Sequence, residues 1–306
     1  MVHSKSQQIT SWAPIVGRWT IEEEVETYLG IQDSCTHPFG LCASNLSLTE
    51  GSVKVSVELS ATKDASGRIL LGYRSPKESY LSVGIGGYKS AYALSEFSVS
   101  YQGWRAVSLA GSEDNLVANT KYEIEVRIEG QRIFLIVNDV KIFEHVLERP
   151  LLSGQTGLFA WGNKEVKFSN MAVNKVTGKV FVVMQFSEPY QQLYSEVIQP
   201  VTKDFDLEAY HAGEVFGPGV IFQDISERII ESKIVIAEVT PANQNVFYEL
   251  GYAHALGKPT ILLAERGKQL PFDIAGYRCL FYENTIGGKQ QVEEALRKHL
   301  QAISHE

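Results

Sequence analysis

The stretch IVIAEVTPANQNVFYELGYAHALGKPTILL, residues 234–263, decides the fold of the second half of the chain. It predicts a buried strand over Ile234–Val239, a turn over Thr240–Asn245, a helix over Val246–Leu256 and a second buried strand over Thr260–Leu263. Because a helix joins two strands that are apolar throughout, the pattern indicates a βαβ unit in a parallel sheet covered on both faces. Such sheets bind ligands beyond the carboxyl ends of their strands, so the turn and the helix start face the expected site.

Glu249 is the candidate catalytic residue of this stretch. Asn245 is a candidate N-cap, and Glu249 follows four residues later, so both side chains project from one face at the helix start. An acid there can simply complement the helix dipole. The flanking Phe247, Tyr248 and Tyr252 instead indicate a half-buried setting, in which a lone carboxylate is costly. A carboxylate held ionised by a helix N-terminus, beside rings that can stack a base, suits stabilisation or capture of a ribosyl oxocarbenium ion.

The rest of the second half continues the alternation of strands and helices. Further strands are expected over Lys179–Phe186, Phe205–Tyr210 and Tyr277–Tyr282, and further helices over Pro189–Val201, Gly219–Glu231 and Lys289–Ile303. Five strands that alternate with helices predict a flavodoxin-like α/β domain with a five-stranded parallel sheet.

The first half, from residue 12 to about 173, has an all-β pattern. Short segments rich in β-branched and aromatic residues are separated by turn signals; they include Val53–Leu59, Arg68–Tyr73, Tyr80–Ile85, Tyr122–Ile128, Arg132–Val137 and Val166–Val173. Asn138-Asp139 is a plausible hairpin turn. Apolar and charged residues alternate in YEIEVRI, as expected of a strand that covers a core on one side. The pattern predicts a β-sandwich.

Two features of the first half have a functional and a structural interpretation. Glu22, Glu24 and Glu26, like Glu123 and Glu125, are spaced as glycosidase carboxylates could be, but a solvated outer strand face is the better account.

Trp104 and the tyrosines around it could form a platform that stacks on sugars, although such residues more often belong to a sandwich core. The Gly84–Gly87 run is better explained by a hairpin turn than by a phosphate loop.

Composition indicates a globular protein of two domains, with the boundary placed in the polar stretch 174–179, giving domains 1–174 and 175–306. The net charge is −8, and the acidic residues outnumber the basic ones in both halves, by 19 to 16 before the break and 17 to 12 after it. Neither half therefore has the basic footprint of a nucleic-acid-binding protein. Three cysteines without a CxxC motif, no apolar leader and no apolar run of 18 residues favour a cytoplasmic protein with free thiols.

The closing part of the first half, RIFLIVNDVKIFEHVLERPLLSGQTGLFAWGNKEVKFSNMAV over residues 132–173, resembles a known fold family. It is similar to the closing hairpins of the concanavalin A-like (laminin G/glucanase-type) jelly roll. This resemblance implies a sandwich used for sensing or interaction, with a protein or glycan as its ligand. The fold hosts lectins, glycoside hydrolases and plain interaction modules, so it does not choose among them.

The second half resembles another family over nearly all of residues 179–303. The runs VFVVMQFSEPYQQLYSEVIQPV and AEVTPANQNVFYELGYAHALGKP, closed by PFDIAGYRCLFY, are similar to the bacterial family related to nucleoside 2-deoxyribosyltransferases and to TIR domains. Members of this superfamily cleave N-glycosidic bonds of nucleosides, nucleotides or NAD, and several TIR-like members are effectors of anti-phage defence.

The resemblance implies roles for particular residues. Glu249 matches the catalytic glutamate, as nucleophile or as stabiliser of positive charge at C1′ of the ribose. The implied substrate contacts are Met184, Gln185, Phe186 and Ser187 at the end of the first strand, Glu214, Asp224, Asn245 and Tyr248. Solvated surface positions are the structural alternative for Asp224 and Glu214.

The chain departs from the family pattern at two places. Glu238 stands where the family has an aspartate, and His211-Ala212-Gly213 stands where members often have Arg-Ala-Asp. A general-acid role for His211 is an alternative to a solvated loop histidine.

The resulting hypothesis is an N-glycosidase that cleaves NAD or a related nucleotide or nucleoside, needs no cofactor or metal, acts as a homo-oligomer and is controlled by the sandwich. Two alternatives stay open: a signalling module that binds a nucleotide without turnover, and a sandwich that carries the main activity on a saccharide.

Overall fold

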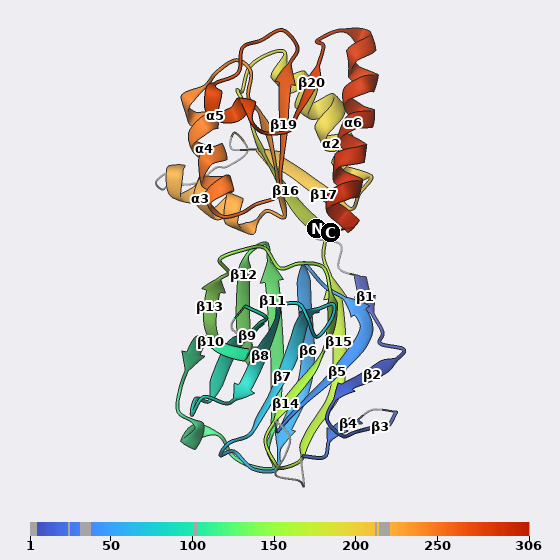
Figure 1. Cartoon of the computed structure of the whole chain (residues 1–306), viewed down its shortest axis with the longest axis vertical. Helices are drawn as coiled ribbons and strands as arrows, with labels where there is room; N and C mark the ends of the chain where they lie inside the picture. The colour runs from blue at the N-terminus through green and yellow to red at the C-terminus, as the bar shows by residue number, and fades with distance from the viewer. Residues whose placement is uncertain are drawn as a thin grey trace. The chain divides into compact units, whose positions relative to one another are not determined.

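The structure is a computed structural model that describes residues 5–23, 25–30, 38–100, 103–211, 213 and 221–305. The chain divides into two compact units. The first comprises Met1–Ile128, Arg132–His145 and Leu151–Val176, and the second comprises Glu129–Gln131, Val146–Pro150 and Thr177–Glu306. Figure 1 labels the elements of both.

The first unit is a sandwich of two antiparallel sheets. One sheet has the order β13 (Val140–Val146), β12 (Arg132–Val137), β11 (Lys121–Glu129), β6 (Gly51–Leu59), β15 (Val166–Lys175), β4 (Val25–Tyr28) and β3 (Trp19–Ile21), with β1 (Lys5–Gln7) beside β15. The other has the order β10 (Gly103–Ala110), β9 (Tyr92–Ser98), β8 (Tyr80–Gly86), β7 (Ser66–Tyr73), β14 (Gln155–Trp161), β5 (Phe39–Ser47) and β2 (Trp12–Val16). A short 3₁₀ helix, η1 (Glu113–Asn115), precedes β11. The predicted all-β jelly roll is confirmed.

Local sequence explains the register of this sandwich. Along β11, Tyr122, Ile124, Val126 and Ile128 are buried while the residues between them are more exposed, as the alternation of YEIEVRI predicts. Asn138 and Asp139 both have positive φ, 49° and 63°, so they form the two-residue hairpin turn that links β12 to β13.

One expectation about this unit is wrong in part. Glu26 on β4 is only 7% exposed, and burial raises the pKa of its carboxyl, so it does not lie on a solvated outer face. Its strand neighbour in sequence, Val25, is more exposed than Glu26, so the acid occupies an inward position of the strand. Glu24 lies outside the described residues. Glu123 and Glu125 do lie on the outer face, where they bond to Ser56 and to Lys54.

The second unit is a five-stranded parallel sheet in the order β17 (Leu207–His211), β16 (Gly178–Val183), β18 (Ile234–Glu238), β19 (Thr260–Glu265) and β20 (Cys279–Tyr282). In chain order this is 2-1-3-4-5, so the predicted flavodoxin-like topology is confirmed. All five residues of β18 are buried, as expected of a central strand covered on both faces.

Helices cover both faces of this sheet (Figure 1). One face carries α1 (Tyr190–Leu193), the π-helical segment η2 (Tyr194–Ile198), α2 (Gln199–Lys203) and α6 (Ile286–His305). The other carries α3 (Ile221–Glu231), α4 (Gln244–Ala255) and α5 (Phe272–Ala275). The predicted helix over Pro189–Val201 is one continuous helical stretch with a π-helical middle. The sequence analysis did not predict α5, because a helix of four residues is too short to give a periodic pattern.

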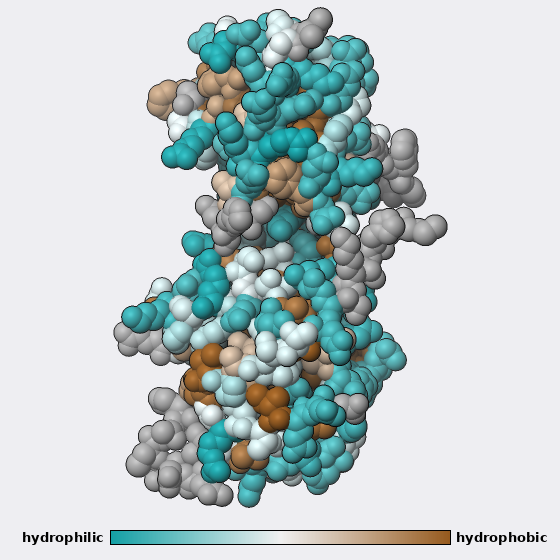
Figure 2. All heavy atoms as spheres, turned by 90° about the vertical axis from the view of Figure 1, so that its right-hand side faces the viewer, coloured by the Kyte–Doolittle hydropathy of each residue, from teal (hydrophilic) through white to brown (hydrophobic). Residues whose placement is uncertain are grey.

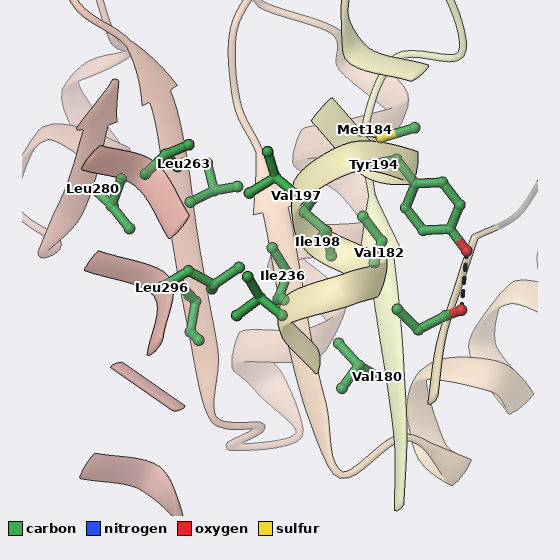
Figure 3. Close-up of a cluster of buried hydrophobic side chains, with 14 of the residues drawn as sticks. Val180, Val182, Met184, Tyr194, Val197, Ile198, Ile236, Leu263, Leu280 and Leu296 are labelled. Carbon is green, nitrogen blue, oxygen red and sulfur yellow. Dashed lines mark hydrogen bonds between the residues drawn. The ribbon is translucent and has the colours of Figure 1, made fainter. Parts of the chain in front are cut away.

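Figure 3 shows the core on the α2 and α6 side. Val180, Val182 and Ile236 of two adjacent strands belong to one buried cluster with Val197 and Ile198 of η2 and Leu296 of α6. The Tyr194 hydroxyl, buried in the same cluster, donates to the carbonyl of Ala209 at 2.9 Å, so the ring contributes apolar area without an unpaired polar group.

The surface has the usual mixed character. On the face that Figure 2 shows, hydrophilic residues predominate and hydrophobic residues gather in small patches. Among the described residues, no helix combines the length and the apolar character that crossing a membrane requires.

A pair of glycine substitutions tests the packing of each unit. A Cβ on Gly67 of β7 would lie 2.4 Å from Val57 Cγ1 of the opposite sheet, whereas a Cβ on Gly251 of α4 would meet nothing within 4 Å. We expect Gly67→Ala to destabilise the sandwich by about 1–3 kcal/mol through overpacking. Gly251→Ala should stabilise its helix by about 0.5–1 kcal/mol. Urea unfolding of both variants measures this, and equal effects of the two would contradict the packing described.

Candidate functional site

The topology of the parallel sheet indicates where a ligand-binding crevice would lie. The chain leaves β16 towards α1 and α2 on one face of the sheet, and it leaves the adjacent β18 towards α4 on the other face. The connections therefore diverge at the carboxyl ends of these two neighbouring strands, which is where ligands of open α/β sheets bind. The residues that follow each strand make up the candidate site.

Four of the expected substrate contacts follow β16. Gln185 donates from Nε2 to the hydroxyl of Ser187 at 2.8 Å, so the two side chains are held together. Phe186 is 41% exposed at this edge. Met184, only 3% exposed, is part of the core beside α2 and is the least accessible of the four.

His211, at the carboxyl end of β17, lies beside this segment. Its ring is 4.6 Å from that of Phe186 and 4.6 Å from that of Tyr194, measured between ring centroids. Its Nδ1 accepts a hydrogen bond from the backbone of Gly213 at 3.0 Å. His211 is therefore not a solvated loop residue: it ends a strand and forms an aromatic cluster with Phe186, a pairing that only the adjacency of β16 and β17 creates.

Glu238, the last residue of β18, has a structural role that the sequence showed only as a departure from a family pattern. It is 1% exposed, and its carboxylate accepts from the backbone N–H of Thr240 at 3.0 Å, from the Thr240 hydroxyl and from the Tyr282 hydroxyl at 3.0 Å. Thr240 Oγ1 also accepts from the backbone of Glu265 at 2.9 Å. These bonds join the carboxyl ends of β18, β19 and β20, and burial raises the pKa of Glu238 to about 7.

The start of α4 differs from the prediction in one respect. The N-cap is Asn243, whose side chain accepts from the backbone N–H of Asn245 at 2.9 Å, so Asn245 is the second residue of the helix and not its cap. Glu249 consequently lies in the second turn. The sequence offers two asparagines of equal capping propensity, Asn243 and Asn245, so the local pattern did not choose between them.

Glu249 is a half-buried carboxylate. Among the described residues it has no hydrogen-bond or ion-pair partner, and burial alone raises the pKa of its carboxyl to about 7. The expectation that the helix N-terminus holds it ionised is therefore wrong, because the second turn lies beyond the strong field of the first and desolvation dominates.

The remaining expected contacts lie around α4. Asn245 is exposed one turn before Glu249, and Tyr248 is 61% exposed. Asp224 lies in the first turn of α3, which packs on the same face of the sheet as α4. Glu214 lies outside the described residues. No hydrogen bond or ion pair between described residues joins Glu249 to the segment after β16.

The sandwich offers a second group of candidate residues. Trp104 is half-buried against Tyr80, Phe97 and Phe159, with ring centroids 4.6–5.7 Å apart. These rings belong to one packed cluster, which supports the interpretation as core over that as a flat sugar platform. Tyr101, one of the tyrosines near Trp104 in the sequence, lies outside the described residues. Cys42 and Cys279 are free thiols.

Comparisons with known proteins concern the fold. No protein-family model matches the chain, and no curated protein matches it. A solved carbohydrate-binding module from Bacillus subtilis is 14% identical, with 54% of this chain and 96% of the module covered and a TM-score of 0.46. A glycosidic hydrolase is 8% identical over 56% of this chain and 94% of its own, with a TM-score of 0.42. A galectin from Caenorhabditis elegans is 15% identical over 49% and 95%, with a TM-score of 0.32.

These similarities agree with a jelly-roll sandwich and carry no argument about ligand or activity. The resemblance of the second half to nucleoside 2-deoxyribosyltransferases and TIR domains stays a prediction.

The burial of Glu249 predicts a stability effect with a defined sign. Its pKa in the folded protein, about 7, is above the ordinary 4.5, so the folded state favours the protonated form. The carboxyl therefore costs stability increasingly as the pH rises from about 4.5 through 7. We expect Glu249→Gln to raise the free energy of unfolding at pH 8, by at most about 3 kcal/mol, and to have little effect at pH 4.5.

Urea titrations at pH 4.5, 6, 7 and 8 measure this dependence, with Glu227→Gln on the exposed side of α3 as the control. A gain that does not grow with pH would contradict the burial of an uncompensated carboxylate.

Proposed function

We propose that the α/β unit binds NAD or a related nucleotide or nucleoside at the carboxyl edge of β16 and β18, and cleaves its N-glycosidic bond with Glu249. The observation that carries this proposal is the carboxylate of Glu249, half-buried on the helix that follows the central strand and without a partner among the described residues. An unpaired, half-buried carboxylate lowers the stability of the fold, and a neutral residue would pack equally well in its place. Such a group is typical of a functional site.

The chemistry suits such a carboxylate. The bond between C1′ and the base nitrogen breaks, and its electron pair leaves with the base. The ionised carboxylate stabilises the positive charge that develops on the ribose, more strongly than in water because the site is partly desolvated. Water then adds to C1′ and releases a proton, which gives free base and the ribosyl product.

Other residues at this edge have chemistry that fits the same substrate. Phe186 and His211 present neighbouring rings that can stack on a base. Gln185, Ser187, Asn245 and Asp224 supply hydrogen-bonding groups for ribose or amide functions, Tyr248 offers an exposed ring, and Met184 lies behind them in the core. Glu214, which follows the second strand in the sequence, is proposed as a contact to a ribose hydroxyl.

The sandwich is proposed to control this activity, and the active form to be a homo-oligomer. A role in anti-phage defence would fit an enzyme that depletes NAD, since uncontrolled loss of NAD harms the cell that makes it. This part of the proposal is supported by the two-unit organisation and the family resemblance.

Turnover by the full-length protein tests the proposal. We expect release of free base from NAD or from a member of a panel of nucleosides and nucleotides, followed by HPLC, and a loss of at least 100-fold in Glu249→Gln. Because only the ionised carboxylate stabilises the cation, the rate should rise with pH and level off above about 7. A rate that grows more steeply than linearly with protein concentration would indicate activation by assembly.

Glu227→Gln is the control and should keep wild-type turnover. Equal activity of Glu249→Gln and wild type would exclude Glu249 as the catalytic group. Binding of a nucleotide without release of base at any concentration would instead favour the alternative, a signalling module that binds a nucleotide and recognises a protein or glycan through the sandwich.

A second candidate function concerns the sandwich, where we propose saccharide recognition. A groove of about 290 Å³ on the eight-stranded sheet is lined by hydroxyl, amide and charged side chains, including Ser56, Lys121, Lys167, Ser169 and Asn170. Such groups can bond to sugar hydroxyls.

A glycan array probed with the full-length protein tests this idea. We expect a defined set of saccharides to bind, with a signal reduced several-fold by Lys121→Ala, which removes a groove side chain. Lys54→Ala, whose side chain bonds to Glu125 and does not line the groove, is the control. Binding unaffected by Lys121→Ala would place recognition elsewhere, and an array without signal would contradict the candidate.

A further inference from the structure

A cavity of about 510 Å³ lies on the face of the parallel sheet opposite to α4 and Glu249. One wall is formed by α1 and η2, and the other by the chain after β20 and the first turns of α6. Figure 1 shows α4 and α6 on the two sides of the sheet. The cavity is thus distinct from the proposed catalytic crevice, and its volume lies in the range typical of small-molecule sites.

The floor of the cavity is apolar and fixed. Val197, Val292 and Tyr282 line it and are only 3%, 2% and 7% exposed. The Tyr282 ring is held by its hydroxyl, which bonds to the buried carboxylate of Glu238 at 3.0 Å. Since Glu238 is itself bonded to Thr240, the position of the Tyr282 ring is fixed before a ligand binds, so a ligand does not have to order it.

The charges at the mouth disfavour an anion. Lys289, the one lysine of the lining, pairs with Glu196 across the cavity at 3.1 Å between Nζ and Oε2. Glu283, also in the lining, pairs with Arg266 outside the lining at 3.6 Å between Oε1 and Nε. The two carboxylates and both cations near the mouth are therefore already in ion pairs. A phosphate would find no unpaired cation among the described lining residues and would lie beside two carboxylates, so an anion is not favoured.

Two backbone amides at the start of α6 are already occupied by the protein. The hydroxyl of Thr285 accepts from the backbone N–H of Gly288 at 3.1 Å, and the backbone carbonyl of Thr285 accepts from the N–H of Lys289 at 3.2 Å. These amides of the first turn are therefore occupied by the protein. What the mouth does offer is side-chain carboxamides, Gln192 and Asn284, and the two carboxylates.

We propose that this cavity binds an uncharged ring compound that carries hydroxyl and amino groups, of the nucleoside class. The apolar floor, with the ring of Tyr282, can pack against the face of a ligand ring. Carboxamides match the donor and acceptor edge of a nucleobase, and carboxylates accept from ribose hydroxyls. The proposal does not depend on catalysis by Glu249, because none of the lining residues belongs to the catalytic crevice.

Adenosine is the probe, titrated into full-length Glu249→Gln protein so that turnover cannot consume it, with binding followed by calorimetry and by the NMR signals of the methyl groups. We expect saturable binding that shifts the methyl signals of Val197 and Val292. Leu193→Trp, which fills the cavity from a half-buried position, should weaken binding at least tenfold. Gln191→Trp, on the same helix but outside the lining, should leave it unchanged.

Two further measurements test the site without Leu193→Trp, which could disturb the fold. Gln192→Ala combined with Asn284→Ala removes only mouth groups and should weaken adenosine several-fold, and adenosine monophosphate should bind at least tenfold more weakly than adenosine. The proposal is overturned by absence of binding at millimolar adenosine, by equal affinity for adenosine and its monophosphate, or by binding that none of the cavity variants affects.

Discussion

The buried carboxylate of Glu238 is the interaction on which the architecture of the α/β unit depends. It ends the central strand, accepts from the backbone and side chain of Thr240, and bonds to Tyr282 at the end of the last strand. The same threonine hydroxyl accepts from the backbone of Glu265. Glu238 is only 1% exposed, and an unpaired carboxylate at this depth would destabilise the fold, so the hydrogen bonds from Thr240 and Tyr282 are required. In return, the carboxyl ends of three strands are held in one arrangement.

Glu238 and Glu249 have a similarly raised pKa but differ in the hydrogen bonds around the carboxyl group. Burial raises the pKa of both Glu238 and Glu249 to about 7. For Glu238, hydrogen bonds from Thr240 and Tyr282 oppose the shift, whereas Glu249 has only the desolvation. A fully bonded carboxylate is accounted for by structure. The other is not, which is why the proposed function rests on Glu249 and treats Glu238 as the group that fixes the turn before α4.

The sandwich also buries a charge, and again hydrogen bonds compensate for it. Arg68 on β7 is 2% exposed; its guanidinium donates to the carbonyl of Gly86 and, through Nη1, to the hydroxyl of Ser95 at 2.7 Å. Burial lowers its pKa to about 10, so it stays protonated at neutral pH. Its strand partner Phe159 packs beneath it, 5.6 Å from the guanidinium carbon to the ring centroid. Buried polar groups of this kind favour one strand register, because a slip of one residue would leave them unpaired.

Sequence alone determined the fold class of both units, because periodicity is a local property. The continuous apolar runs of Ile234–Ala237 and Ile261–Ala264, and the alternation along Lys121–Glu129, follow from which faces each strand buries. Tertiary structure decided the rest of the candidate site. The burial and pKa of Glu249, the bond between Glu238 and Tyr282, 44 residues apart, and the contact of the Phe186 ring with His211 depend on neighbours distant in the chain. Desolvation and side-chain pairing are set by those neighbours, so no local pattern could supply them.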